Sequence, residues 1–251
     1  MAAFDHGLAL GADALELDVH LSRDGVVVVH HDPTLERTTN ASGAIRLKTA
    51  AELAGVDAGY RFRGGDSDSH TPAEGAGQGG SHEFLFRGKG IGVPTLHEVL
   101  ARYPVPLIIE LKTPEAALAR ATVDELRAAD AVGRVALGSF YSQGLHAARA
   151  YEPRLATGAA REETRWALYK SWVHWPLRRV AFREFQVPER SGRTQIVTPR
   201  FVRHAHRAGV PVKVWTVNAH EDIERLLNWG VDAIISDRPD VAVAAAAGWP
   251  R

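Results

Sequence analysis

The sequence contains no cysteine among its 251 residues. This absence excludes disulfides, thiolate nucleophiles and cysteine-bound metals, so any metal site has to use carboxylates or histidines. Thirty basic and thirty acidic residues give a formal net charge of zero. Because no charge of one sign dominates, the composition gives no reason to expect a nucleic acid or a membrane surface as a general partner.

Long apolar runs are also missing. No stretch approaches the roughly 20 consecutive apolar residues that span a bilayer. The N-terminal "MAAFDHGLALG" has neither the basic region nor the apolar core of a signal peptide. We therefore expect a cytoplasmic protein without stable membrane insertion. The hydrophobic content of 45% fits one large domain, predicted over residues 1–251, and leaves the oligomeric state open.

Short apolar runs alternate with helical patterns over most of the chain. The runs "VPLIIELKT", "RVALGSF", "RLATGA", "EFQVPE", "VPVKVWTVN" and "VDAIISD" predict strands, and "EAALARATVDELRAADAVG" and "TPRFVRHAHRAG" predict helices between them. This alternation is typical of βαβ units around a parallel sheet, so we predict an α/β fold. Residues 64–90 are rich in glycine and serine without periodicity, and we predict a flexible loop there.

The first apolar strand has two acidic residues on one side. In "ALELDV", alternation places Leu15, Leu17 and Val19 on one face and Glu16 and Asp18 on the other. If the second face were open to water, the pattern would indicate only a half-buried surface strand.

A second strand repeats the pattern and favours a buried site instead. In "LIIELK", Glu110 and Lys112 share one face. In a parallel sheet covered by helices, or inside a closed barrel, this face does not meet bulk water. Glu16, Asp18 and Glu110 together form a hard-oxygen site suited to Mg²⁺ or Ca²⁺. Lys112 adds a positive charge suited to a phosphate ester.

A histidine follows the first strand at short range. Asp24-Gly25 is a hairpin signal, and antiparallel pairing about this turn places His31 opposite Asp18. A histidine titrates near neutral pH and can transfer protons there. The segment therefore brings a candidate acid/base group to the carboxylates.

These motifs resemble one known family. The stretch "GADALELDVHLSRDGVVVVHHDPTLERTTNASG" is similar to the glycerophosphodiester phosphodiesterases, and the likeness continues in order through "LIIELK", "VKVWTVN" and "GVDAIISDRPD". The resemblance implies a distorted TIM (β/α)8 barrel and a divalent cation, Mg²⁺ or Ca²⁺. It also implies hydrolysis of a small-molecule glycerophosphodiester to an alcohol and sn-glycerol 3-phosphate.

The resemblance assigns roles by position. It implies that Glu16, Asp18 and Glu110 are metal ligands, that His31 is one of two acid/base histidines, that Lys112 is a catalytic phosphate contact, and that Trp215 is an aromatic of the substrate pocket.

The sequence departs from the family pattern at its start. Members of the family usually begin with a strand ending in His-Arg-Gly, followed by a Glu-Asn-Thr run, and neither occurs here. We therefore expect an N-terminally truncated barrel without the second histidine. Two alternatives stay open: a non-catalytic phosphate- or metal-binding relative, and a phospholipase-D-like enzyme acting on intact phospholipid. The intact acidic motifs favour the enzyme.

Residues 161–184 combine three tryptophans, Trp166, Trp172 and Trp175, with several arginines. One interpretation is a membrane-surface element that delivers lipid-derived substrates. The other is an irregular segment that packs its tryptophans on the barrel rim. The imperfect apolar spacing and the neutral net charge favour the second interpretation.

Overall fold

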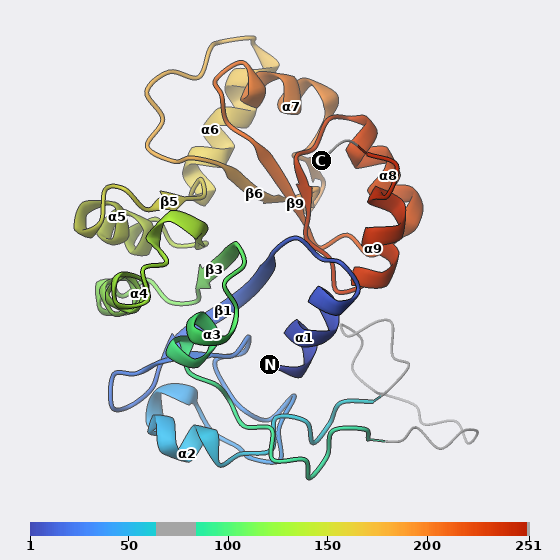
Figure 1. The fold of residues 1–251 in the computed structure, drawn as a ribbon. Helices are drawn as coiled ribbons and strands as arrows, with labels where there is room; N and C mark the ends of the chain where they lie inside the picture. The colour runs from blue at the N-terminus through green and yellow to red at the C-terminus, as the bar shows by residue number, and fades with distance from the viewer. Residues whose placement is uncertain (64–83, 250–251) are drawn as a thin grey trace.

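The computed structural model describes residues 1–63 and 84–249 (Figure 1). Most of its strands are parallel and lie side by side in chain order. They are β1 (Leu15–Leu21), β3 (Leu107–Leu111), β4 (Val135–Gly138), β5 (Ala156–Thr157), β6 (Phe185–Pro188), β9 (Val212–Trp215) and β10 (Ala233–Ile234). The short β2 (Val27–Val29) pairs antiparallel with β1, and β7 (Arg190–Ser191) forms a small hairpin with β8 (Thr194–Gln195).

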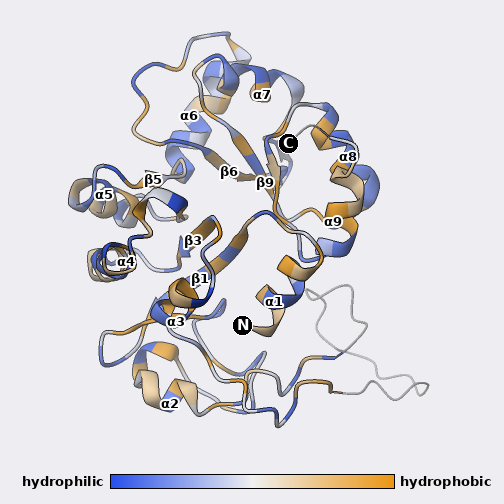
Figure 2. Cartoon of the chain, in the orientation of Figure 1, coloured by the Kyte–Doolittle hydropathy of each residue, from blue (hydrophilic) through white to orange (hydrophobic). Residues whose placement is uncertain are grey.

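Helices surround these strands on the outside. They are α1 (Ala2–Ala9), α2 (Ala50–Ala54), α3 (Leu96–Arg102), α4 (Ala116–Ala128), α5 (Ser142–Tyr151), α6 (Arg161–Trp172), α7 (Pro199–His206), α8 (His220–Asn228) and α9 (Pro239–Ala246). Figure 2 shows apolar and polar residues interleaved along both strands and helices. Within the described residues, no helix combines the length and the apolarity that crossing a membrane requires.

The strand order is that of a distorted TIM-type barrel. Two ladders, β2-β1-β3-β4-β5 and β6-β9-β10, are connected by a parallel bridge between Gly158 and Glu184. Each parallel strand thus neighbours the next one along the chain, as in a (β/α)8 barrel. No ladder joins β10 to β1 among the described residues. The predicted α/β barrel class is confirmed, with this irregularity.

The outward strand faces form the core against the helices. Leu17, Val19 and Ile109 are at most 3% exposed and pack in one cluster with residues of α3 and α4. A second cluster joins β6 and β9 to α7 and α8 around Phe185 and Phe201. In β1, β3, β6 and β9 the apolar side therefore faces the helices, and the side that carries the polar residues faces the interior of the barrel.

The β1–β2 hairpin differs by one residue from the predicted register. Val19 pairs with Val29, and the backbone N–H of His30 donates to the Asp18 carbonyl at 3.0 Å. The loop has three residues rather than two, and its last residue, Gly25, adopts a φ of +80°. Three-residue hairpins need such a left-handed position, and their extra residue shifts the pairing. His30, not His31, therefore lies opposite Asp18.

The other predicted elements are confirmed within a few residues, except in one segment. Of residues 161–184, for which the sequence favours an irregular segment, residues 161–172 instead form the regular helix α6, and residues 173–183 contain no helix or strand. Residues 64–83 of the predicted loop lie outside the described residues, and residues 84–90 form turns. The prediction of a single domain over residues 1–251 stays a prediction.

The chain around Gly92 packs closely against the end of helix α2 in the segment that follows β2. A Cβ added to Gly92 would lie 2.2 Å from the backbone oxygen of Ala54. We expect Gly92→Ala to lower the free energy of unfolding by about 1–3 kcal/mol, because neither backbone can give way. Gly7→Ala in α1 is the matched control, since nothing lies within 4 Å of its added Cβ. The control should gain stability, by up to about 1 kcal/mol from helix propensity. Equal melting temperatures for the two variants would contradict this account.

Candidate active site

Three carboxylates converge on the inner face of β1 and β3. The parallel register pairs Asp18 directly with Glu110, and Glu16 lies two residues earlier on the same face of β1. One carboxylate oxygen from each residue lies within 4.8 Å of the others. All three residues are only partly buried, so the cluster can be reached from solvent.

Lys112 forms ion pairs with two of these three carboxylates. It follows the last residue of β3, and its Nζ lies 2.9 Å from Asp18 Oδ1 and 3.1 Å from Glu110 Oε1. The Lys112 side chain is 16% exposed. A single ammonium thus faces three carboxylates in a half-buried site.

Burial and mutual repulsion change the protonation of the cluster. Desolvation, followed by the charges of Asp18 and Glu110, raises the pKa of Glu16 to about 8. Desolvation also raises the pKa of Glu110, although Lys112 opposes the shift. Desolvation acts to lower the pKa of Lys112, but hydrogen bonds and charges from Asp18 and Glu110 outweigh it and raise the pKa. The cluster therefore lacks enough positive charge to hold all its carboxylates ionised near neutral pH.

His31 lies just beyond β2, bound to an acidic partner. Its Nδ1 donates to Asp32 Oδ1 at 2.7 Å, and 60% of the His31 side chain is exposed. Arg37 donates to both oxygens of Asp32, at 2.5 and 2.9 Å. These hydrogen bonds from Arg37, with that from His31, lower the pKa of Asp32. An ionised Asp32 fixes the proton on Nδ1 and leaves Nε2 of His31 free.

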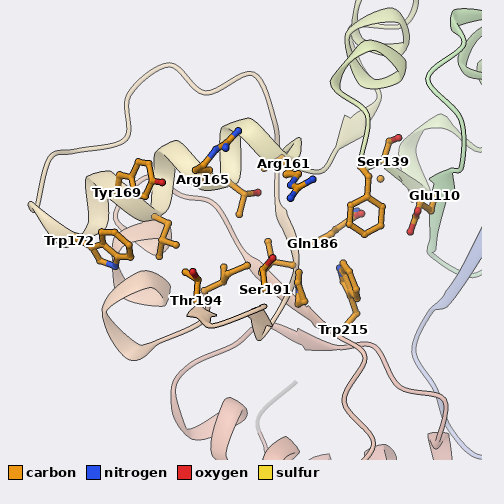
Figure 3. Close-up of a pocket in the computed structure, with 18 residues that line it drawn as sticks. Glu110, Ser139, Arg161, Arg165, Tyr169, Trp172, Gln186, Ser191, Thr194 and Trp215 are labelled. Carbon is orange, nitrogen blue, oxygen red and sulfur yellow. The ribbon is translucent and has the colours of Figure 1, made fainter. Parts of the chain in front are cut away.

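A second ion pair lies in the other half of the barrel. Lys213 Nζ of β9 lies 2.8 Å from Glu184 Oε2, and Gln186 donates to Glu184 Oε1 at 2.7 Å. Trp215, two residues after Lys213, packs edge-on against Phe140 with ring centroids 5.7 Å apart. Trp215 lines the same cavity as Glu110 (Figure 3).

Of the residues predicted for the site, some contact one another directly and others only share a cavity or act at longer range. Glu16, Asp18, Glu110 and Lys112 form one contact cluster. Trp215 shares a cavity with Glu110. The charge of His31 opposes the rise in the pKa of Glu110, as Lys112 does more strongly, so His31 acts on the cluster electrostatically.

Several polar residues of the site were missed from the sequence. Arg37 gave one weak signal, since it lies five residues after Asp32 in the "HDPTLER" run. Glu184, Gln186 and Arg161 gave none, because only the barrel brings their strands and helix to the same interior.

The carboxylate cluster fits a divalent cation. Oxygen ligands from carboxylates suit Mg²⁺ and Ca²⁺, and spacing within 4.8 Å permits all three groups to contact one ion. After desolvation, the largest causes of the raised pKa of Glu16 are the negative charges of Asp18 and Glu110. A bound cation would neutralise these charges, so the raised pKa agrees with this fit.

An acidic cluster with a lysine, on the interior face of neighbouring barrel strands, is a set of groups that metal-assisted hydrolysis of phosphoric diesters can use. Comparison with known proteins specifies the family. The sequence profile described as "Glycerophosphoryl diester phosphodiesterase family" matches residues 1–241. The chain therefore belongs to this family, whose members hydrolyse glycerophosphodiesters and generally use a divalent cation.

Individual relatives agree over nearly the whole chain. A glycerophosphodiester phosphodiesterase of Caldanaerobacter subterraneus is 30% identical and is matched over 97% of this chain and 89% of its own length. The crystal structure of a glycerophosphodiester phosphodiesterase from Agrobacterium tumefaciens superposes with a TM-score of 0.70 at 25% identity, covering 96% of this chain and 91% of the other.

A third comparison supports the fold alone. A phosphodiesterase of Oleispira antarctica, solved in complex with the product sn-glycerol-3-phosphate, superposes with a TM-score of 0.69 at 24% identity. The alignment covers 98% of this chain and 90% of the other.

The raised pKa of Glu16 predicts how stability depends on pH without cations. From its usual pKa of 4.5 up to about 8, the folded protein keeps a proton on Glu16 that the unfolded chain releases. The folded state binds more protons, so the free energy of unfolding should fall as pH rises through this window. Thermal melts in a chelating buffer would measure the slope.

Glu16→Gln should flatten that slope, because glutamine does not ionise. The exposed Glu221→Gln on α8 serves as the matched control and should keep the wild-type slope. An identical pH dependence in wild type and Glu16→Gln would mean that Glu16 titrates normally.

Proposed function

We propose that the chain hydrolyses glycerophosphodiesters to an alcohol and sn-glycerol 3-phosphate at the β1–β3 cluster. Glu16, Asp18 and Glu110 hold one divalent cation, either Mg²⁺ or Ca²⁺. The observation that supports this role is the convergence of the three carboxylates within 4.8 Å beside the Lys112 ammonium. A bound divalent cation polarises phosphoryl oxygens and lowers the pKa of an attacking water or hydroxyl.

Lys112 binds the phosphate in this proposal. An ammonium has three N–H donors, and contacts to Asp18 and Glu110 use two of them. The third donor is available to a phosphoryl oxygen, where negative charge develops during the reaction. The two carboxylates also keep Lys112 protonated, because they raise its pKa.

His31 transfers a proton through its Nε2 atom. Asp32 accepts the Nδ1 proton and holds the ring, so Nε2 is the atom that exchanges a proton with the substrate or water. Arg37 keeps Asp32 ionised and in place. Trp215 lies beside the cluster and contacts the organic part of the substrate.

The proposal is tested by cation-dependent hydrolysis of glycerophosphocholine and glycerophosphoethanolamine. Product formation should require Mg²⁺ or Ca²⁺, and separate assays with each ion identify the one that is used. A folded chain that binds a cation but releases no glycerol 3-phosphate would instead support the non-catalytic alternative.

Loss of one ligand should abolish cation binding without unfolding the protein. In Asp18→Asn, the amide carries no negative charge, so added Mg²⁺ or Ca²⁺ should no longer raise the melting temperature. Asp124→Asn makes the same chemical change at an exposed position of α4 and should keep the wild-type shift. If Asp18→Asn shows an undiminished shift, the ligand assignment is wrong.

His31→Ala should slow turnover by about a hundred- to ten-thousand-fold, because it removes a proton-transfer group. The loss should lie mainly in kcat, and the cation-induced thermal shift should persist. His97→Ala is a matched control, since His97 is also an exposed histidine paired with a carboxylate, 3.3 Å from Glu125. Full activity of His31→Ala would exclude His31 as the acid/base group.

A further inference from the structure

A cavity of about 450 Å³ opens beside the carboxylate cluster. Its walls come from the loop after β4, from α6, from the β6–β8 region and from β9. The lining includes Glu110, so the cavity is continuous with the proposed reaction site. Its volume lies in the range of roughly 300–1,000 Å³ that is typical of small-molecule sites.

The cavity changes in character along its length (Figure 3). Ser139, Gln186 and Arg161 lie at the end near Glu110, and Tyr169 and Trp172 lie at the other end. Helix α6 forms the wall between the two ends. Its rise from Arg161 to Trp172 is about 16 Å at 1.5 Å per residue. The end near Glu110 can therefore hydrogen-bond a polar group, and the other end presents aromatic rings to which an apolar group can bind.

Buried hydrocarbon side chains line part of the remaining wall, alongside the polar Arg165 and Thr194. Leu168, Val187 and Ile196 are at most 8% exposed, and all three face the cavity. Water next to these three side chains has few hydrogen-bond partners, so an apolar group replaces it favourably there. A small polar alcohol such as choline or glycerol would leave this part of the cavity unused.

Exposed aromatic side chains continue from the cavity to the surface of α6. Trp172 is 49% exposed, and its ring packs against Tyr169 with centroids 5.3 Å apart. Trp166 is 64% exposed and contacts Tyr169 from the other side, but it does not line the cavity. Tyr169 and Trp172, half-exposed aromatics that line the cavity mouth, indicate a surface that an apolar molecule covers, and Trp166 lies outside it.

We propose that this cavity binds the acyl chain of a lysophospholipid, the substrate class of the same reaction site. The chain lies between α6 and the β6–β8 wall, the glycerol faces Arg161 and Gln186, and the phosphate reaches Lys112. The cavity accommodates one chain, so the occupant is a single-chain lipid. This inference depends on the phosphodiesterase function proposed above.

The reaction is the same hydrolysis with a larger substrate. Water adds to phosphorus, the bond between phosphorus and the head-group oxygen breaks, and that oxygen takes up a proton. The products are an acylglycerol phosphate, which keeps the chain, and the free head-group alcohol. Both products can be measured separately by mass spectrometry.

The first test varies the length of the chain. Lysophosphatidylcholines from hexanoyl to dodecanoyl are assayed below their aggregation concentrations, with glycerophosphocholine as the chainless reference. The value of kcat/KM should rise by up to roughly fourfold for each buried methylene and then level off when the cavity is full. A kcat/KM that is independent of chain length, or highest for glycerophosphocholine, overturns the inference.

Variants locate the effect in the cavity. Thr194→Trp fills the space from the exposed β8 strand, and Trp172→Ala removes an aromatic wall; both should reduce the increase in kcat/KM per methylene. Trp166→Ala changes the same residue type on the same helix outside the cavity and should keep the wild-type dependence. Melting temperatures show that each variant is folded. An unchanged chain-length dependence in both cavity variants overturns the inference.

A binding measurement separates the two proposals. Calorimetric titration with decyl phosphate and with methyl phosphate should show tighter binding of the decyl compound to wild type and a smaller difference in Thr194→Trp. If no diester is hydrolysed but decyl phosphate binds in this pattern, the proposed function fails and the acyl-chain site stands. If glycerophosphocholine is hydrolysed and the two phosphates bind equally, the acyl-chain site fails and the proposed function stands.

Discussion

Repulsion among three carboxylates is the constraint on which the site depends. The parallel register of β1 and β3 places Glu16, Asp18 and Glu110 on one interior face, where desolvation strengthens every charge interaction. Desolvation and then the charges of Asp18 and Glu110 raise the pKa of Glu16, and the single positive charge of Lys112 only partly opposes them. In the proposed function, a divalent cation bound by the three carboxylates would neutralise this excess of negative charge.

The carboxylate cluster could be predicted from the sequence because its cause is local. Alternation along a strand fixes which residues share a face, and two such strands in a parallel sheet share one interior. The position of His31 could not be fixed in the same way. Its placement depends on the length of the hairpin loop, and the φ of +80° at Gly25 gives a three-residue loop that shifts the pairing by one.

Helix α6 shows a second limit of sequence patterns. Its buried positions are Thr164, Ala167, Leu168 and Ser171, of which only Leu168 is strongly apolar. The helix therefore has a weak hydrophobic pattern, while its tryptophans point to solvent and the cavity. Glu184 and Lys213 come into contact only because the barrel brings their strands together, so their ion pair could not be predicted from the sequence.

The same barrel separates two tasks between its two halves. Strands β1 and β3 supply the carboxylates and Lys112, which in the proposed function act on the phosphate that all glycerophosphodiesters share. Helix α6, the β6–β8 region and β9 supply the cavity that we propose for the variable organic part of the substrate. Only Glu110 belongs to both the cluster and the cavity lining. Because the two halves share so little, side chains on α6 can change which substrate is bound while the carboxylate spacing that the chemistry requires stays the same.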